Sequence, residues 1–248
     1  MRLPVAVQLY SIRDEVVKDF IGALEKVAEI GYNGVEFAGF GDVPAAKMKA
    51  ALDRLGLKAV GSHTGIDLLV NKLDEVMEYN LEIGNKYIVC PYDKRDSREG
   101  YMELAKLYTG IGEKCRDKGL QFCYHNHAHE LQKYDGEYAL DTLFANTCPD
   151  LLKAEIDTFW VYYAGLDPVE YVRKYTGRCP LLHLKDMEAG EARDFAEVGN
   201  GIINIKGLVD VAGEIGTEWL VVEQDRCKRP PLESIKISFD NLKALNAG

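Results

Sequence analysis

The sequence lacks three features that would point to other classes of protein: paired cysteines, a glycine-rich phosphate loop and a long apolar run. Its six cysteines are scattered without a C-x-x-C pair, and two lie in apolar strand-like runs, as buried thiols commonly do. No segment approaches the roughly 20 apolar residues of a membrane span, and the apolar stretch before Arg13 is too short for a secretory signal. We therefore expect a cytoplasmic protein without a membrane partner.

Basic residues are in deficit as well. The chain has 30 Lys and Arg against 40 Asp and Glu, a net charge of -10 and a pI near 5.1. Such a chain has no overall field that attracts a phosphate backbone, so we expect no nucleic-acid partner, although a local basic group can still bind one phosphate. The 248 residues are 47% hydrophobic and 28% charged, which is ordinary globular usage and predicts one domain over residues 1–248.

Short apolar runs rich in strand-forming residues alternate eight times with longer helical patterns. The predicted strands are Val5 to Leu9, Gly34 to Phe37, Lys58 to Ser62, Tyr87 to Cys90, Gln121 to His125, Leu152 to Asp157, Leu181 to Lys185 and Trp219 to Glu223. The predicted helices are Phe20 to Ile30, Pro44 to Leu55, Leu73 to Ile83, Tyr101 to Lys118, Tyr138 to Ala145, Pro168 to Tyr175, Ile205 to Ile215 and Leu232 to Leu245. Eight units in about 250 residues predict an α/β fold, a single (β/α)8 TIM barrel.

An open doubly wound sheet also alternates strands and helices, so it is the structural alternative. It usually has a glycine-rich phosphate loop after the first strand. Here that strand continues into Gln8-Leu9-Tyr10-Ser11-Ile12-Arg13, and neither G-x-G-x-x-G nor G-x-x-x-x-G-K-[ST] occurs in the chain. Unit count and length therefore favour the barrel, whose active site would lie at the carboxyl ends of the strands.

The predicted strands end in polar residues, and all five histidines lie at or just beyond such an end. A single histidine there is more often a hydrogen-bonded structural group than a ligand. Converging His, Asp and Glu side chains, however, are the usual ligands of Zn, Mn, Co and Mg. We therefore expect a metal or acid–base site among Gln8, Tyr10, Glu36, His63, His125, His127, His129, Asp157, His183, Lys185, Asp186, Glu223, Gln224 and Asp225.

Residue parity supports this convergence. Glu155 and Asp157 have the same parity on one strand, so both can point into the barrel mouth, where two buried carboxylates need a cation. The alternative is that Glu155 pairs with a cationic side chain on an adjacent strand while Asp157 only caps the next loop. His183 and Lys185 share a face in the same way, and Glu223 ends the eighth strand, where we interpret it as the final ligand.

The most specific local feature is His125-Asn126-His127-Ala128-His129-Glu130, because three imidazoles and a carboxylate in six residues rarely serve packing alone. The other distinctive motifs are Gln8-Leu-Tyr-Ser-Ile-Arg-Asp14, Ile156-Asp-Thr158 with Trp160, His183-Leu-Lys-Asp186, Val198-Gly-Asn-Gly201 and Val222-Glu-Gln-Asp225. In combination, and over essentially the whole chain, these motifs resemble the sugar phosphate isomerase/epimerase family of the xylose isomerase-like TIM-barrel superfamily. Members of that family include isomerases, epimerases, inosose-type dehydratases and enzymes acting on oxidised glycosides.

The resemblance implies one divalent metal ion (Mn, Co, Mg or Zn) held by Asp157, His183, Glu223 and a carboxylate of the fifth unit. Relatives of tagatose epimerase have a glutamate at the end of the fifth strand. This chain has His125 there, with Glu130 shortly after it, so the fifth-strand ligand stays open between the two.

For the activity, we expect abstraction of a proton α to a carbonyl of a small polyhydroxylated substrate, through a metal-stabilised enediolate, as in an isomerase or epimerase. Glu223 is a candidate base as well as a ligand. His127 or His125 would act as acid or base, since imidazole titrates near neutral pH, and Lys185 would hold a substrate oxygen or phosphate. The expected substrate contacts are Gln8, Tyr10, Glu36, His63, Trp160 and Lys185, with Phe37 as a further aromatic candidate.

Three alternatives remain. A lyase of the inosose dehydratase type would let the same enediolate expel a β-hydroxyl, with a histidine as general acid. An endonuclease of the same superfamily would need more metal ligands and a basic groove, which the acidic balance disfavours. A barrel that binds carbohydrate without turnover is the third. The sequence leaves the oligomeric state open, a homo-oligomer included.

Overall fold

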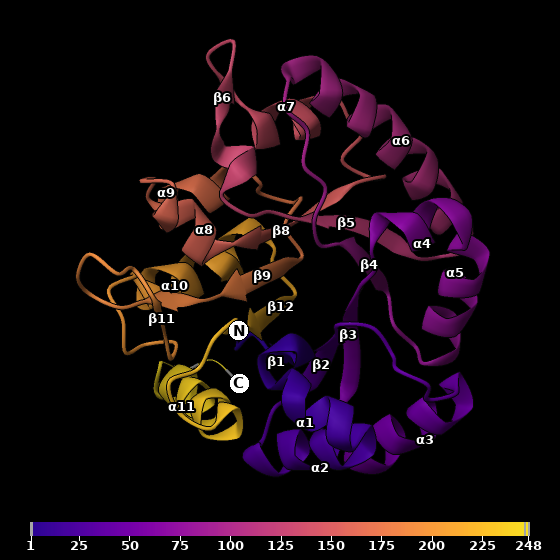
Figure 1. Ribbon diagram of the computed structural model, residues 1–248, viewed down its shortest axis with the longest axis vertical. Coiled ribbons are helices and arrows are strands. Elements are labelled where there is room, and N and C mark those ends of the chain that lie inside the picture. Colours follow the sequence, from indigo (N-terminus) through magenta and orange to yellow (C-terminus); the bar gives the residue numbers. More distant parts are fainter. Residues whose placement is uncertain (1, 246, 248) are drawn as a thin grey trace.

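The computed structural model describes residues 2–245 and residue 247. Eight parallel strands close into a barrel in the order β1-β12-β9-β8-β5-β4-β3-β2 (Figure 1). They are β1 (Val5–Gln8), β2 (Gly34–Phe37), β3 (Lys58–His63), β4 (Tyr87–Cys90), β5 (Gln121–His125), β8 (Lys153–Asp157), β9 (Leu181–Leu184) and β12 (Trp219–Val222). The predicted TIM barrel is therefore confirmed, with each predicted strand within one residue of its observed bounds.

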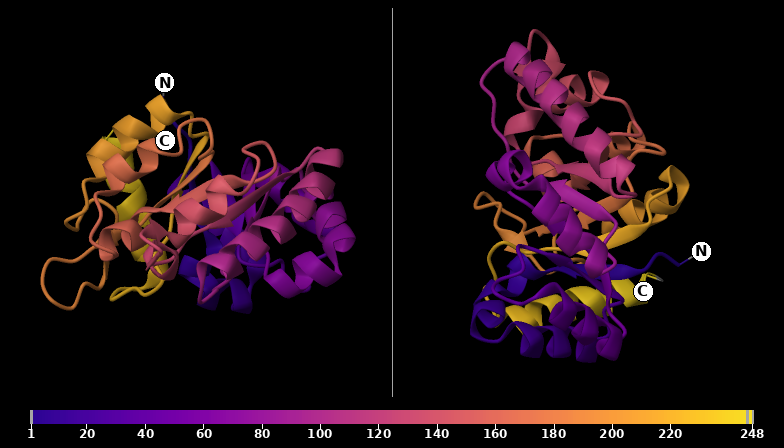
Figure 2. Two further views of the ribbon diagram at one scale, coloured as in Figure 1. Left: turned by 90° about the horizontal axis from the view of Figure 1, so that it is seen from above. Right: turned by 90° about the vertical axis from the view of Figure 1, so that its right-hand side faces the viewer.

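The eight predicted helices form the outer ring, and the first and last of them, α2 and α11, lie side by side (Figure 2). They are α2 (Phe20–Ile30), α3 (Ala45–Leu55), α5 (Leu73–Glu82), α6 (Arg98–Asp117), α7 (Ala139–Ala145), α9 (Pro168–Arg173), α10 (Ile205–Ile215) and α11 (Pro231–Ala244). None of the helices in the described part of the chain is both long and apolar enough to span a membrane.

Short elements that the sequence did not predict lie mostly in the connections that follow the strands. They are η1 (Leu9–Ile12), α1 (Arg13–Lys18), α4 (Ile66–Asn71), η2 (His129–Leu131), α8 (Thr158–Tyr163) and the hairpins β6–β7 (Lys133–Tyr134, Glu137–Tyr138) and β10–β11 (Asp186–Met187, Phe195–Ala196). Each helix among them has six residues or fewer, too few for a clear helical period.

Local chemistry sets the ends of the helices in the ring. Gly31 and Gly216 end α2 and α10 with φ of 112° and 83°, a left-handed conformation that glycine adopts without a steric penalty. At the start of α9, the Asp167 carboxylate accepts hydrogen bonds from the backbone N–H groups of Val169 and Glu170, with Pro168 in the first turn. These contacts explain why α9 begins at the predicted residue, Pro168.

Two layers of side chains fill the barrel interior. The lower layer is apolar and consists of Ala6, Val60, Tyr87, Val89, Cys123, Leu181 and Val221. Alternate residues of a strand point to the same face. On each regular strand, the residue two positions after a member of the apolar layer therefore also points into the barrel, one layer closer to the carboxyl ends. Most of these positions are polar: Gln8, His125, His183 and Glu223. The strand pattern itself therefore places a polar cluster on an apolar floor.

Candidate active site

A cavity of about 390 Å³ opens at the carboxyl ends of the strands. This is the end at which TIM barrels carry their active sites. Seven predicted site residues contribute to its wall, together with residues of the connections after β2 and β4. The lining consists of Tyr10, Ala38, His63, Pro91, Tyr92, His125, His127, Lys185, Glu223 and Asp225.

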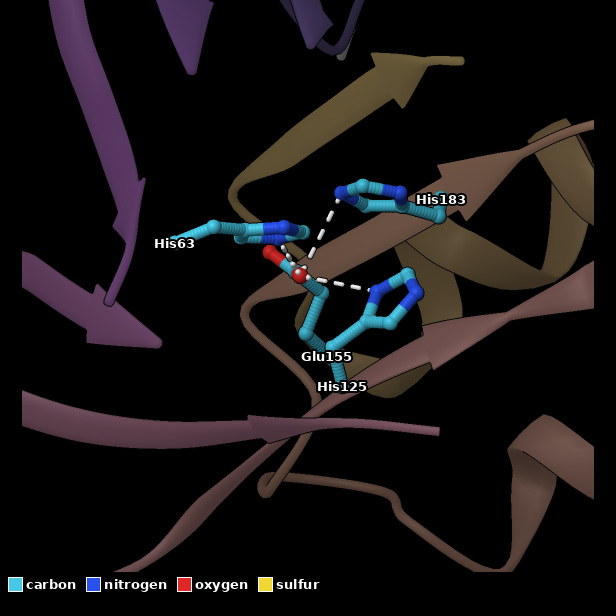
Figure 3. A group of neighbouring side chains, drawn as sticks. All are labelled: His63, His125, Glu155 and His183. Carbon is cyan, nitrogen blue, oxygen red and sulfur yellow. Dashed lines mark hydrogen bonds and ion pairs between the residues drawn. The ribbon is translucent and has the colours of Figure 1, made fainter. Parts of the chain in front are cut away.

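We call His63, His125, Glu155 and His183 the inner group. Figure 3 shows the three imidazoles turned toward the Glu155 carboxylate. Glu155 Oε2 lies 2.8 Å from His63 Nε2, 3.0 Å from His125 Nδ1 and 3.3 Å from His183 Nε2. The four ligand-type atoms lie within 4.8 Å of one another. The prediction that Glu155 points into the barrel is confirmed, and its neighbours are imidazoles, two of which, His125 and His183, lie on the adjacent strands β5 and β9.

Glu36 on β2 supports this group from below. Its Oε2 lies 2.6 Å from His183 Nε2 and 3.3 Å from His63 Nε2, and accepts a hydrogen bond of 2.9 Å from Gln8 Nε2. The carboxylate fits because residue 61 is glycine, since a Cβ there would lie 2.3 Å from Glu36 Oε1. Oε1 is buried and has no hydrogen-bond partner among the described residues.

Burial and charge oppose each other in this layer. Burial tends to lower the pKa of His63, but Glu36 and Glu155 outweigh it and raise that pKa to about 10. The pKa of His183 is raised by the same carboxylates against the same burial. Burial lowers the pKa of His125, with the positive charges of His183 and His63 adding to it. Two imidazolium ions therefore balance two carboxylates around a neutral His125.

The outer group consists of His125, Asp157, His183 and Glu223. All four side chains are buried, and their ligand-type atoms lie within 4.8 Å of one another. Because Asp157 follows Glu155 by two residues on β8, this group forms the next layer toward the cavity. His183 links the two layers, since its Nδ1 lies 3.1 Å from Glu223 Oε2 while its Nε2 faces Glu36.

Lys185 supplies a fixed positive charge at the outer group. Its Nζ lies 2.9 Å from Asp157 Oδ2, 2.8 Å from Glu223 Oε2 and 2.8 Å from Asp225 Oδ1. Burial tends to lower the pKa of Lys185, but the three carboxylates outweigh it and raise that pKa well above its usual value. The side chain is therefore an ammonium hydrogen-bond donor at the cavity wall.

Asp157 has two roles, which the sequence analysis treated as alternatives. Its Oδ1 accepts hydrogen bonds from the backbone N–H groups of Phe159 at 2.9 Å and Trp160 at 3.3 Å, which caps α8. Its Oδ2 faces Lys185 in the outer group. Burial raises the pKa of Asp157 to about 6, with Lys185 acting in the opposite direction. One residue therefore fixes a helix and contributes to the site.

Of the two candidates for the fifth-strand ligand, His125 belongs to both groups and Glu130 to neither. Glu130 Oε1 lies 2.5 Å from Tyr124 Oη, and Oε2 accepts a hydrogen bond of 2.9 Å from the backbone N–H of His127. Burial raises the pKa of Glu130 to about 7. The structure thus places Glu130 beneath the histidine segment, where it holds the backbone of that segment.

His127 is a cavity-wall imidazole that pairs with no carboxylate of the described chain at its Nδ1. Its ring centroid lies 5.1 Å from that of His125 and 5.5 Å from that of Trp160. Burial and then the charge of Lys185 lower the pKa of His127 to about 3. The ring is therefore neutral at physiological pH, and its Nδ1 has no hydrogen-bond partner among the described residues.

Four of the other predicted contacts are not part of the cavity lining: Gln8, Glu36, Trp160 and Phe37. Gln8 donates a hydrogen bond to Glu36, which contacts His183, and Trp160 lies beside His127. Phe37 is fully buried in the core between strands and helices. Tyr10 lines the cavity and is 43% exposed. The sequence analysis did not identify three wall residues in connections without a strand pattern: Ala38, Pro91 and Tyr92.

The sequence analysis noted Asp186 but missed its structural role. Its Oδ1 accepts hydrogen bonds from the backbone N–H groups of Met187 and Ile203, and its Oδ2 accepts two from Gly199 and Gly201, all at 2.8–3.0 Å. Gly201 leaves no room for a side chain, because a Cβ would lie 2.3 Å from Asp186 Oδ1. One carboxylate therefore shapes the loop that follows β9.

A family model described as xylose isomerase-like TIM barrel matches residues 24–245. The chain belongs to this family. The resemblance to sugar phosphate isomerases/epimerases found in the sequence is thereby confirmed. Within this xylose isomerase-like family, an inosose dehydratase of Geobacillus kaustophilus is 28% identical over 189 residues, which are 66% of this chain and 61% of that enzyme. The chain spans about half the length of other inosose dehydratases that it matches.

Solved structures share the barrel over its full extent. A sugar phosphate isomerase/epimerase from Parabacteroides distasonis superposes with a TM-score of 0.86 at 25% identity, covering 98% of this chain and 94% of that one. The IOLI protein, crystallised with a binding zinc atom, superposes with a TM-score of 0.78 at 14% identity, covering 99% and 98%. The second likeness concerns the fold alone.

Proposed function

We propose that this xylose isomerase-like barrel is a metal-dependent dehydratase of a keto-inositol or a similar polyhydroxylated cyclic ketone. The observation that carries the proposal is the cavity wall, in which a neutral imidazole, His127, and an ammonium, Lys185, stand beside a buried set of metal-ligand side chains. The similarity to inosose dehydratases supports the lyase over the isomerase that the sequence analysis favoured.

The residues present fit a divalent cation. The outer group, His125, Asp157, His183 and Glu223, offers two imidazoles and two carboxylates within 4.8 Å of one another, a donor set suited to Zn, Mn or Co. An imidazole–carboxylate cluster that is buried in this way is otherwise costly. When bound, such an ion would supply Lewis-acid polarisation of the substrate carbonyl.

The protein groups would perform the proton transfers. His127 takes the proton from the carbon α to the carbonyl, and the electron pair left on that carbon forms the double bond as the β carbon–oxygen bond breaks. The same imidazolium returns its proton to the departing hydroxyl, which leaves as water. Lys185 donates a hydrogen bond to the carbonyl oxygen while negative charge develops there. Atoms and charge balance, and the product is an enone.

An isomerase or epimerase is the second candidate, and the similarity to the Parabacteroides distasonis protein favours it. The first step is shared, because an enediolate also forms when His127 removes the α proton. The reactions diverge in the second step, where the proton returns to carbon and no carbon–oxygen bond breaks.

The test incubates Mn²⁺- or Co²⁺-loaded protein in D₂O with keto-inositols and, separately, with ketoses. The dehydratase predicts rising ultraviolet absorbance of an enone from a keto-inositol. His127→Gln should lower that rate by roughly 10²- to 10⁴-fold, the usual contribution of a general acid–base group. The matched control is His129→Gln, in the same segment but in neither group and not in the cavity wall.

The outcomes separate the candidates. New epimers or isomers without enone absorbance would favour the isomerase and overturn the dehydratase. Absence of both products and of deuterium at the α carbon for every substrate would overturn the shared first step. Equal activity losses in His127→Gln and His129→Gln would remove His127 from its role.

A further inference from the structure

We propose that the inner group binds a second divalent metal ion, so that the site holds two ions in adjacent layers. His63, Glu155 and His183 would ligate the inner ion, with Glu36 as the second carboxylate beside it. This inference extends the proposed function, because it adds an ion to the same site. Of these four side chains, only His183 also belongs to the outer group, and the chemistry described above does not require the other three.

The geometry of the inner group resembles that of converging ligands. Three imidazole nitrogens lie 2.8–3.3 Å from one carboxylate oxygen of Glu155 (Figure 3). Two ligands on one zinc ion are about 3.3 Å apart, given bond lengths near 2.0–2.1 Å in a tetrahedron. Shifts of a few tenths of an ångström would therefore open space for an ion.

Two unsatisfied oxygens point to a missing partner. Glu36 Oε1 and Glu155 Oε1 are both fully buried and accept no hydrogen bond from any residue that the structure describes. Buried polar atoms normally have partners, and a carboxylate oxygen without one is costly. Ligation of an ion by either carboxylate would satisfy such an atom.

The shared imidazoles divide naturally between the layers. A neutral imidazole ligates one ion and donates its other N–H, often to a carboxylate. His183 Nε2 faces the inner carboxylates while its Nδ1 lies 3.1 Å from Glu223. His125 has the reverse orientation: its Nδ1 lies 3.0 Å from Glu155, and its Nε2 lies 3.6 Å from Asp157, too long for a hydrogen bond. With both ions bound, His183 would serve the inner ion, and His125, Asp157 and Glu223 would remain as the donors of the outer ion.

Charge favours two ions over one. Five carboxylates surround the two layers: Glu36, Glu155, Asp157, Glu223 and Asp225. Lys185 is the one Lys or Arg side chain recorded in contact with them in the described chain, so four negative charges remain. Two divalent ions supply four positive charges, whereas a single ion leaves two carboxylates to be balanced by protons on the imidazoles. Uncompensated buried charges are strongly unfavourable.

Metal stoichiometry of the intact chain tests the inference. The protein is stripped with a chelator, saturated with Co²⁺ by equilibrium dialysis and analysed for bound metal per chain. We expect two ions per chain in the wild type and in the control His129→Gln. We expect one ion per chain in His63→Gln, which alters only the inner group, and one in Asp157→Asn, which alters only the outer group. One ion or fewer in the folded wild type, or two in folded His63→Gln, would overturn the inner site.

A second measurement needs no variant. Two Mn²⁺ ions in adjacent sites lie roughly 3.5–4 Å apart and couple magnetically, so electron paramagnetic resonance of wild type with two equivalents of Mn²⁺ should show a coupled multiline signal. A spectrum of isolated ions alone would contradict the pair. Neither readout uses substrate: two ions without turnover would refute the proposed reaction only, and turnover with one ion would refute the second ion only.

Discussion

Removal of the Lys185 ammonium is the perturbation whose effect the structure defines most sharply. Lys185 is 1% exposed and lies within 2.9 Å of one carboxylate oxygen each of Asp157, Glu223 and Asp225. Lys185→Met keeps much of the apolar stem and removes only the charge. Without a metal ion, the variant leaves three carboxylates facing one another at the cavity wall.

The size of the effect follows from the burial of these groups. Removing one partner of a buried ion pair costs about 3–5 kcal/mol. For a domain of this size, 1 kcal/mol corresponds to a shift of about 2–4 °C in Tm, so metal-free Lys185→Met should melt roughly 6–20 °C below the wild type. Saturating Mn²⁺ should reduce this loss, because the ion would supply positive charge to Asp157 and Glu223.

Thermal melts of chelator-treated and Mn²⁺-loaded protein measure both effects. The matched control is Lys206→Met, since Lys206 is exposed and pairs only on the surface with Asp210, where ion pairs contribute about 0.2–1 kcal/mol. If metal-free Lys185→Met and Lys206→Met melted at the same temperature, the ammonium would have no structural role. If Mn²⁺ failed to narrow the gap, the metal would not occupy the outer group.

Three further changes test other parts of the site. Burial raises the pKa of Glu130 from 4.5 to about 7, so folding favours the protonated form of this carboxyl group. The free energy of unfolding of the wild type should therefore fall by up to about 3 kcal/mol as the pH rises from about 4.5 through 7. In Glu130→Gln, the free energy of unfolding measured in urea should depend less on pH. Asp186→Ala removes three acceptor contacts to the loop 197–204 and should speed amide hydrogen exchange there. Gly61→Ala should displace the Glu36 carboxylate, because its Cβ would lie 2.3 Å from Oε1, and lower the bound metal measured after dialysis.

Two of these changes have a matched control, and each of the three has a contradicting result. Glu197→Gln, which alters another buried glutamate outside the site, is the control for the pH profile of unfolding. A parallel profile for Glu130→Gln and wild type would contradict the raised pKa. Gly213→Ala, where a Cβ meets nothing within 4 Å, controls for glycine replacement. Unchanged exchange in Asp186→Ala, or unchanged metal content in Gly61→Ala, would contradict the packing described for those residues.

The barrel was predictable because its strands are buried on both faces and its helices have a clear period. Strand β4 (Tyr87–Cys90) is a continuous buried run, and β9 (Leu181–Leu184) is another, as parallel sheets require. The short helix α8 was not predicted. Its start depends on the Asp157 carboxylate cap, a contact that also belongs to the site, and sequence spacing could not indicate that one residue has both roles.

The membership of the site was predictable only in part. Parity on a strand correctly placed Glu155, Asp157 and His183 toward the barrel interior, because side-chain direction alternates by residue. The ligand of the fifth strand was not predictable from the motif. Glu130 lies in a short 3₁₀ turn, and its carboxylate accepts a hydrogen bond from the backbone N–H of His127. The conformation of this turn directs Glu130 away from both groups, and the motif alone does not specify that conformation. The stacking of two groups also depends on packing between distant strands.

The most direct test of the account is a crystal of the protein soaked in Mn²⁺, with anomalous diffraction data collected to locate the ions. The account predicts one anomalous peak within coordination distance of Asp157 and Glu223 and a second within coordination distance of His63 and Glu155, at about 2.0–2.3 Å from their ligand atoms. Well-ordered density for these side chains with no anomalous peak among them would contradict the claim that this cluster is a metal centre.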